Sequence, residues 1–356
     1  MLSRELSDNK LQIDCLDGLR GLAALIVVAS HTSNAGMYFL PFLKFEGLGK
    51  SGVYLFFLIS SFLLTRPLLS KGEKIFSFDN MSHYWQRRFF RIYPLYFIYL
   101  VTALTTTSIL TNIFNKSDMG IPFSLTFSEL INHLILIEGK GVTWSIAVEF
   151  KFYFILPFLV YIIYKLKCLE NTYQILFLLI CIVLTSNIFP SSDSKVNDIS
   201  LLPYLPIFFT GILCAVIQES VKDYSKTFFK LISTIGIVGM ILMTPKVFSE
   251  LFFVVPNNFF HREFLMYTIL WACILIAAIN TKGILNKILC SKTLKFFGAI
   301  SFSLYLFHVS FIKIFSRIEV TDSIDAWLVL LLASVLAYLS FRLIELPTSR
   351  FKIQSV

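Results

Sequence analysis

The sequence lacks the cysteine and histidine patterns that mark a metal site or a disulfide framework. Its six cysteines are scattered through or beside apolar segments, with no C-x-x-C spacing and no clustering with the five histidines. Zinc sites and disulfide scaffolds depend on such close or regular spacing. We therefore expect no structural metal and no disulfide.

Boundaries between domains are missing as well. No internal repeat, low-complexity tract or linker divides the chain, and no soluble domain is recognisable after the last apolar segment. Residues 1–10 are polar, and no small-residue cleavage site of the usual kind follows them, unlike in a secretory signal peptide. We expect one integral-membrane domain over residues 1–356, with its first apolar helix retained.

Apolar residues are abundant. They make up 56% of the chain, with 38 phenylalanines, and the mean hydropathy is +0.75. Long apolar runs recur along the whole length and predict an all-α, polytopic membrane protein of about ten transmembrane helices, since each span needs roughly 18 to 25 residues. The expected spans are residues 16–37, 48–68, 90–111, 142–164, 173–190, 201–219, 229–246, 263–280, 297–316 and 324–345.

Basic residues predict the orientation, because Lys and Arg gather in cytoplasmic loops. With the N-terminus placed inside, most of the 31 Lys and Arg residues fall in the inner segments. Both termini are therefore expected to be cytoplasmic. Topology also accounts for the net charge of +9, so we expect no nucleic-acid partner.

A charged motif opens the first span. The segment LDGLRG, which contains Asp17 and Arg20, runs into an apolar helix with a single histidine, His31. Eleven helical steps make about three turns, so Arg20 and His31 share one helix face about 16 Å apart. An ionisable residue within a span is by default a functional candidate that faces the protein interior or a water-filled cavity.

A second basic motif, RRFFRIYP, ends the polar segment before the third span. On a helix, Arg88 and Arg91 are i,i+3 neighbours, and Arg87 faces Arg91 at i,i+4. Guanidinium groups this close suit a phosphate between them. A membrane anchor that reaches lipid headgroups is an equally good interpretation from the sequence.

The motif TWSIAVEFKFY opens the fourth span. Ser145, Glu149 and Tyr153 recur at i,i+4 and share one face, and Trp144 stands where an interfacial aromatic residue belongs. The orientation places Glu149 and His31 at similar depth in the outer half of the membrane, so we expect the two side chains to meet. The alternative is that Glu149 serves packing by pairing with another helix.

Two later features are interpreted as structural. His308 is i,i+3 from Tyr305, and a hydrogen bond between helices is preferred for it over a substrate role. Arg342 and Glu345 are i,i+3 neighbours and are expected to form an ion pair.

Together these segments resemble the acyltransferase-3 family of membrane acyltransferases, which includes bacterial O-antigen and exopolysaccharide O-acetylases. The matching pieces, in order, are LDGLRG with Arg20-x10-His31, RRFFRIYP, TWSIAVEFKFY, SFSLYLFH ending in His308, and RLIELP. Some members add a C-terminal extracytoplasmic esterase-like domain, which we expect this chain to lack because it stops soon after the last span.

The resemblance implies transfer of an acyl group, usually acetyl, from cytoplasmic acyl-CoA to a hydroxyl of a cell-surface saccharide or its glycolipid precursor. The enzyme would sit in the bilayer of the bacterial cytoplasmic membrane, with acetyl-CoA as donor and no metal. A homo-oligomer is left open.

The resemblance also implies roles for the candidate residues. Arg88 and Arg91, with Arg87, would hold the phosphates of CoA, and Arg20 would guide the donor. His31 would be the general base, and Glu149 would orient it or act as the base itself. A covalent acyl intermediate on His31, Ser145 or a tyrosine stays open. The remaining substrate-site candidates are Ser145, Trp144, Tyr153, Asp17 and His308.

Two other classes are weighed against this interpretation. A transporter or flippase of a lipid-linked saccharide would also use buried charges, and it predicts broken helices in corresponding halves of the chain. A membrane glycosyltransferase would use Glu149 as base and the arginines for a lipid pyrophosphate. Donor dependence distinguishes the three classes.

Overall fold

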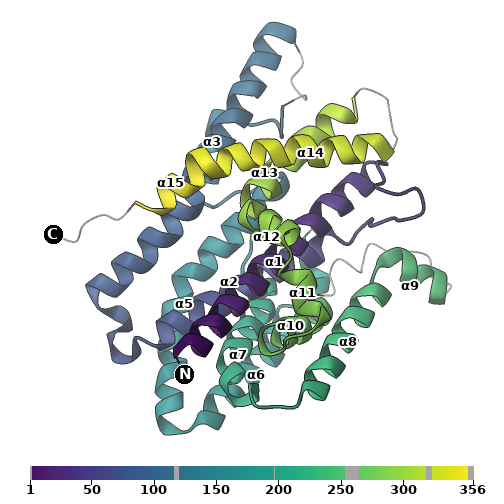
Figure 1. Ribbon diagram of the computed structural model, residues 1–356. Coiled ribbons are helices and arrows are strands. Elements are labelled where there is room, and N and C mark those ends of the chain that lie inside the picture. Colours follow the sequence, from purple (N-terminus) through teal and green to yellow (C-terminus); the bar gives the residue numbers. More distant parts are fainter. Residues whose placement is uncertain (1, 116–119, 196, 253–263, 318–322, 352–356) are drawn as a thin grey trace.

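The computed structural model describes the chain except residues 1, 116–119, 196, 253–263, 318–322 and 352–356, and it describes residues 2–13 by their backbone alone. The described residues form helices and no strand, which confirms the all-α prediction (Figure 1). The α-helices are α1 (Leu2–Asn34), α2 (Gly49–Leu69), α3 (Phe78–Phe114), α4 (Phe127–Leu134), α5 (Trp144–Leu169), α6 (Asn171–Ile188), α7 (Leu205–Val221), α8 (Lys226–Leu242), α9 (Pro245–Phe252), α10 (Phe264–Asn280), α11 (Ile284–Leu289), α12 (Lys292–Ala299), α13 (Ser301–Phe315), α14 (Ser323–Ser340) and α15 (Leu346–Ser349).

The described helices match the predicted spans in position. Seven are long and apolar enough to cross a bilayer, or up to nine when each of two bent pairs counts as one span. These pairs are α8 with α9, bent by 80°, and α12 with α13, bent by 78°. The predicted range 263–280 falls on α10, a shorter apolar helix. The total of about ten spans and the cytoplasmic termini stay predictions.

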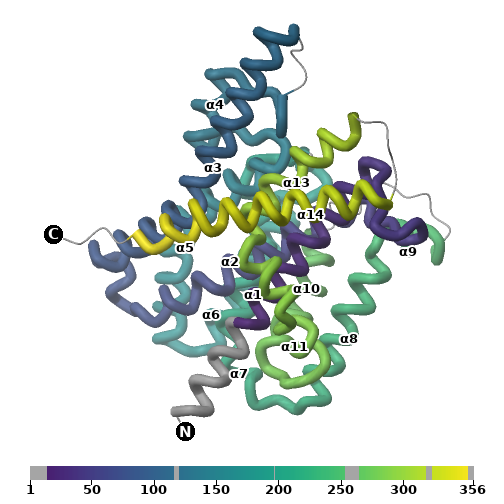
Figure 2. The backbone as a smooth tube through the Cα atoms, turned by 45° about the horizontal axis from the view of Figure 1, so that its top comes forward, coloured from purple at the N-terminus to yellow at the C-terminus, as the bar shows by residue number. Residues whose placement is uncertain are grey.

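Helices α1, α2, α5 and α7 form the centre of the bundle. In α2 and in α7, 67% of the most apolar stretch of the helix is buried inside the protein. The buried share is only 17% in α3 and 22% in the segment that contains α14. Helix α14 packs on α13, and the chain beyond it crosses towards α3 (Figures 1 and 2). The chemistry-bearing motifs of α1 and α5 therefore lie in the protected interior.

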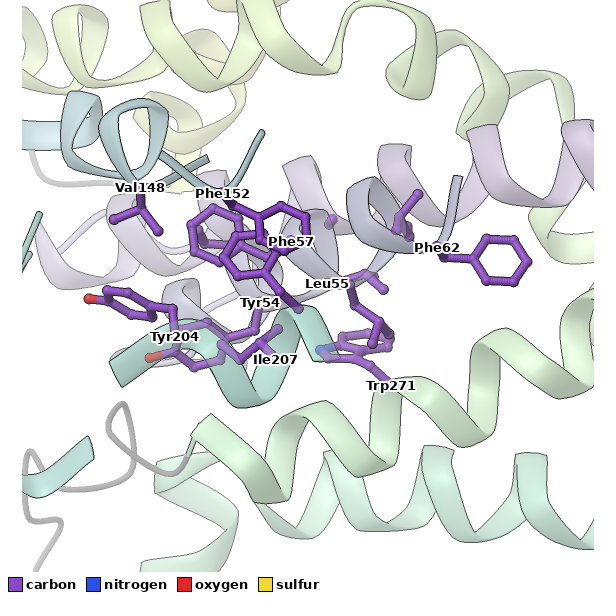
Figure 3. Close-up of a cluster of buried hydrophobic side chains, with 14 of the residues drawn as sticks. Tyr54, Leu55, Phe57, Phe62, Val148, Phe152, Tyr204, Ile207 and Trp271 are labelled. Atoms are coloured by element: carbon purple, nitrogen blue, oxygen red, sulfur yellow. The ribbon is translucent and has the colours of Figure 1, made fainter. Parts of the chain in front are cut away.

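Stacked aromatic rings hold the central helices together (Figure 3). Phe208 of α7 stacks on Phe57 of α2 and on Phe152 of α5, with ring centroids 4.8 and 3.9 Å apart. Figure 3 shows Phe57 and Phe152 within this buried cluster. The indole of Trp271 donates to the carbonyl of Ser51 at 2.9 Å and ties α10 to α2. Because lipid is as apolar as these side chains, close packing and internal hydrogen bonds are what keep such helices associated.

The glycines of LDGLRG have a packing role. A Cβ on Gly18 would lie 1.8 Å from the carbonyl oxygen of Leu289, and one on Gly21 would lie 2.1 Å from the backbone of α12. From the other side, a Cβ on Gly298 would lie 2.0 Å from the carbonyl oxygen of Asp17. Only glycines let the backbones approach this closely. The motif thereby fixes the rotation of α1, and with it the direction of Arg20.

The predicted ion pair between Arg342 and Glu345 is wrong. Glu345 is buried and accepts a hydrogen bond from the hydroxyl of Ser303 on α13, whereas Arg342 is exposed. A π-helical turn over Phe341–Glu345 widens the helix here. The ordinary i,i+3 relationship on which the prediction depended therefore does not apply.

Candidate active site

The predicted site residues line two neighbouring cavities. The first, which we name the arginine cavity, has a volume of about 70 Å³ and is lined by Arg20, Arg91, Ser60, Ser145, Glu149 and Tyr153, among others. The second, the histidine cavity, has a volume of about 1100 Å³, and its lining includes Ser30, His31, Asn34, Gly49, Lys50 and Trp144. Tyr305 and Val53 line both. One face of α1 therefore passes from one cavity to the other, as the spacing of Arg20 and His31 predicts.

A small hydroxyl network separates the two cavities. The hydroxyls of Tyr305 and Ser145 lie 2.8 Å apart. Each also lies within hydrogen-bond distance of the carbonyl oxygen of Val142, at 2.9 Å for Tyr305 and 3.1 Å for Ser145. Since Ser145 lines the arginine cavity and Val142 the histidine cavity, these bonds cross the wall between them. Tyr305, from α13, is a site residue that the sequence analysis did not select.

The imidazoles of His31 and His308 are hydrogen-bonded to each other. Nδ1 of His31 lies 2.7 Å from Nε2 of His308, and the rings are nearly parallel, at 15°. Nδ1 of His308 lies 3.1 Å from the carbonyl oxygen of Leu304. A carbonyl only accepts, so Nδ1 of a neutral His308 carries the proton and its Nε2 accepts from Nδ1 of His31. Nε2 of His31 is then left unprotonated, with its lone pair available.

His308 thus forms the predicted hydrogen bond between helices, but its partner is the candidate base itself. The predicted meeting of His31 with Glu149 does not occur. The carboxylate of Glu149 instead accepts from the hydroxyl of Ser60 on α2, and from that of Tyr153 at 2.5 Å. Glu149 lies in the arginine cavity, and the wall that contains Tyr305 separates that cavity from the one lined by His31.

The three arginines of RRFFRIYP have different environments. Arg91 is half-buried and lines the arginine cavity together with Arg20. Arg88 is also half-buried, and its Nε is buried without a hydrogen-bond partner among the described residues. Arg87 is exposed and lines neither cavity. A buried guanidinium nitrogen without a partner is costly, and an anion such as a phosphate would satisfy it.

The other candidates divide between the cavities and their surroundings. Ser145 and Tyr153 share one lining with Glu149, as their spacing predicts. The indole of Trp144 lines the histidine cavity, with the ammonium of Lys50 at 5.3 Å from the ring. Asp17 is half-buried and lines neither cavity. It lies near enough to Arg91 for their charges to interact.

The cysteines and the acidic residues show no further centre in the described part of the chain. There, no three His, Cys, Asp or Glu side chains come together as metal ligands would. The free thiols of Cys15 and Cys290 lie 3.0 Å apart, and the amide of Asn286 donates to Cys15 at 3.2 Å.

Comparison with known proteins identifies relatives over almost the whole chain. A family model described as an acyltransferase domain matches residues 13–343. The peptidoglycan O-acetyltransferase OatA of Listeria monocytogenes is 26% identical over 94% of this chain and 55% of its own length. The O-acetyltransferase OatA of Staphylococcus aureus strain NCTC 8325 is 27% identical over 93% of this chain and 56% of its own length. A putative O-acetyltransferase of S. aureus strain COL is 25% identical over 96% of this chain and 58% of its own length.

The chain therefore spans little more than half the length of the curated relatives it matches. No solved structure matches it.

Proposed function

Because the chain belongs to the acyltransferase family whose domain matches residues 13–343, we propose that it is a membrane-embedded O-acetyltransferase. Acetyl-CoA is the donor, and a hydroxyl of a cell-envelope saccharide, or of its lipid-linked precursor, is the acceptor. The relatives named O-acetyltransferases support the type of reaction. The predicted membership of the acyltransferase-3 family is confirmed.

The donor binds with its phosphates beside the arginine cavity, which at about 70 Å³ holds only part of the molecule. Arg88 and Arg91 hold phosphate groups of CoA, which is consistent with the unpartnered Nε of Arg88 and with the place of Arg91 in the lining. Arg20 also lines this cavity. It shares a helix face with His31, about three turns away, and guides the arm that carries the thioester. The cytoplasmic membrane is the expected location, because acyl-CoA is made on its inner side.

The acceptor binds at the histidine cavity. Its volume of about 1100 Å³ suits a ligand larger than water, and the indole of Trp144 offers an aromatic surface. The peptidoglycan named for the Listeria relative supports a cell-wall saccharide as the acceptor class.

His31 is the general base. The acceptor hydroxyl attacks the acyl carbon, its proton passes to Nε2 of His31, the carbon–sulfur bond breaks, and the proton then goes to the thiolate of CoA. A positioned base contributes roughly 10²–10⁴-fold to such a transfer. His308 keeps His31 in the tautomer whose Nε2 is unprotonated, and this hydrogen-bonded pair is the observation that carries the proposal.

The transporter class is less well supported. It predicts broken helices in corresponding halves of the chain, whereas the two bent pairs that the described residues contain, α8 with α9 and α12 with α13, both lie in the second half.

The test is transfer of labelled acetyl from acetyl-CoA to cell-envelope glycan in membrane vesicles, with wild type and His31→Ala at matched expression. Transfer by wild type alone is the expected result. Equal transfer by His31→Ala would remove His31 from the mechanism. Absence of transfer by wild type, with endogenous acceptor present, would overturn the donor assignment.

A further inference from the structure

We propose that the hydroxyl of Ser30 and the first turn of α2 at Gly49 form an oxyanion site beside His31. This inference rests on the proposed O-acetyl transfer. It assigns the task of stabilising the charged tetrahedral intermediate to two residues that the recognised motifs do not specify.

Ser30 carries a buried hydroxyl without a partner. The residue is 1% exposed, and its Oγ has no hydrogen-bond partner among the described residues. Ser30 lines the histidine cavity beside His31. A buried hydroxyl without a partner destabilises a protein, and most native structures avoid it. A hydroxyl kept at such a position is well placed to donate to a ligand.

Gly49 brings the start of α2 to the same place. A Cβ on Gly49 would lie 3.2 Å from Oγ of Ser30 and 3.6 Å from Cδ2 of His31. The absence of that Cβ lets Ser30 and the ring of His31 lie close to the backbone of α2 at its first turn. Gly49 also lines the histidine cavity, so this close contact lies at the edge of the proposed acceptor site.

The first turn of α2 is suited to negative charge. The helix is 21 residues long, its N-cap Leu48 makes no side-chain capping bond, and its first turn contains no acidic residue. The amide of Ser51 already donates to the carbonyl of Leu48 at 3.0 Å, so the donor that this turn offers is the amide of Gly49, where the helix dipole also places partial positive charge. Together with the buried hydroxyl of Ser30, this amide provides donors of the two kinds found in oxyanion holes.

Short contacts hold the start of α2 against the end of α1. The amide of Phe45 donates to Oγ of Ser33 at 3.2 Å, and the amide of Gly47 donates to Oδ1 of Asn34 at 3.2 Å. These bonds fix the loop between the two helices. The oxyanion donors are therefore in place before substrate binds, which is the condition under which such donors are most effective.

The arrangement matches the chemistry of the transfer. Cδ2 of His31, which faces Gly49, is bonded to Nε2, the nitrogen left unprotonated by the bond to His308. As the acceptor oxygen bonds to the acyl carbon, the carbonyl π electrons move to its oxygen, and the hydroxyl proton goes to Nε2. The hydroxyl of Ser30 and the amide of Gly49 then donate to the new oxyanion. When the carbonyl re-forms, the thiolate leaves and takes the proton.

The test compares Ser30→Ala with wild type, measuring labelled acetyl transfer from acetyl-CoA to endogenous glycan in membrane vesicles. At saturating acetyl-CoA, the rate is expected to fall about 10²–10³-fold, as for the loss of one oxyanion donor. The KM for acetyl-CoA is expected to stay unchanged. The melting temperature should stay equal or rise, because the variant removes a buried hydroxyl without a partner.

Ser334→Ala is the matched control. Ser334 on α14 also has a buried Oγ without a partner among the described residues, but it lines neither cavity. Its removal should leave the rate unchanged. A rate loss as large as that of Ser30→Ala would indicate a general packing effect and would overturn the proposal.

Gly49→Ala provides a second variant. Its methyl group would lie 3.2 Å from the hydroxyl oxygen of Ser30 and crowd the donor, so the rate should fall, while alanine in a helix favours folding over glycine. A rate within threefold of wild type in both variants overturns the oxyanion site, and so does a raised KM at unchanged maximal rate. Inactive wild type would overturn the proposed function and this site with it, so the two failures are distinguishable.

Discussion

His31 and His308 are hydrogen-bonded at 2.7 Å across 277 positions of sequence. The bond joins α1 to α13 and lies at the edge of the larger cavity. Because Leu304 accepts from the far nitrogen of His308, the direction of every proton in the chain of three groups is determined. The outermost member of that chain is a nitrogen lone pair on His31, which is what a general base requires.

Replacing His308 should separate orientation from packing. His308→Leu removes the acceptor for Nδ1 of His31, which is then free to adopt the other tautomer or ring orientation. The transfer rate is expected to fall about 10²-fold, at the lower end of what a positioned base contributes. His308→Gln, whose side-chain oxygen can accept from His31, should keep a rate within tenfold of wild type. Equal rates for His308→Leu and wild type would show that His308 is only a packing residue.

The different environments of Arg87, Arg88 and Arg91 predict that replacing each of them changes the affinity for acetyl-CoA to a different extent. Arg88→Ala and Arg91→Ala should each raise the KM for acetyl-CoA about 10- to 100-fold, since a hydrogen bond to a charged group is worth about 1.5–3 kcal/mol. Arg87→Ala should stay near wild type, because Arg87 is exposed and lines neither cavity. Initial rates over a range of acetyl-CoA concentrations check this. A KM change of the same size in all three variants would favour the lipid-anchor interpretation.

The sequence was sufficient to predict which side chains share one face of a helix. The common face of Ser145, Glu149 and Tyr153 follows from helical geometry alone, and all three line one cavity. The helices themselves were predictable because apolar runs long enough to cross a bilayer are uncommon in other settings.

Relationships between helices were not predictable from the same pattern. Glu149 accepts from Ser60, which lies within an apolar run of α2 that carries no signal of its partner. Helix α13, which carries His308, is bent by 78° from α12, and the single Gly298 beside the break, without a proline, does not predict that angle. The prediction that His31 and Glu149 meet used only their similar depth in the membrane. Depth alone does not show that the wall containing Tyr305 lies between them.

The close approach of α1 and α12 predicts which glycines tolerate a methyl group. Gly298→Ala would place a Cβ 2.0 Å from the carbonyl oxygen of Asp17, so the helices would have to separate. The cost should be about 1–3 kcal/mol, as for other overpacked sites. Gly283→Ala is the control, because nothing lies within 4 Å of its Cβ position. Thermal unfolding in detergent measures both. Equal melting temperatures for the two variants would contradict this packing.

Mild acid should weaken the segment around α4 through His133. Its Nδ1 donates to the carbonyl of Glu129 at 2.7 Å, and its Nε2 accepts from the amide of Lys140 at 2.9 Å. Both bonds fit the neutral ring, and burial lowers the pKa of His133 below its ordinary value of 6.5. The stabilisation is therefore complete above pH 6.5 and is lost as the pH falls towards the lowered pKa, by at most about 1.4 kcal/mol per pH unit.

A variant without the His133 imidazole tests whether acid weakens this segment through that group. In His133→Gln, the melting temperature should start lower than in wild type at pH 7.5 and should fall less on acidification to pH 5.5, because one titrating group has been removed. His83→Gln, at an exposed position of α3, is the matched control for the loss of an imidazole and should keep the wild-type melting temperature at pH 7.5. If wild type and His133→Gln lost stability in parallel, the neutral imidazole of His133 would not be the group that links folding of this segment to pH.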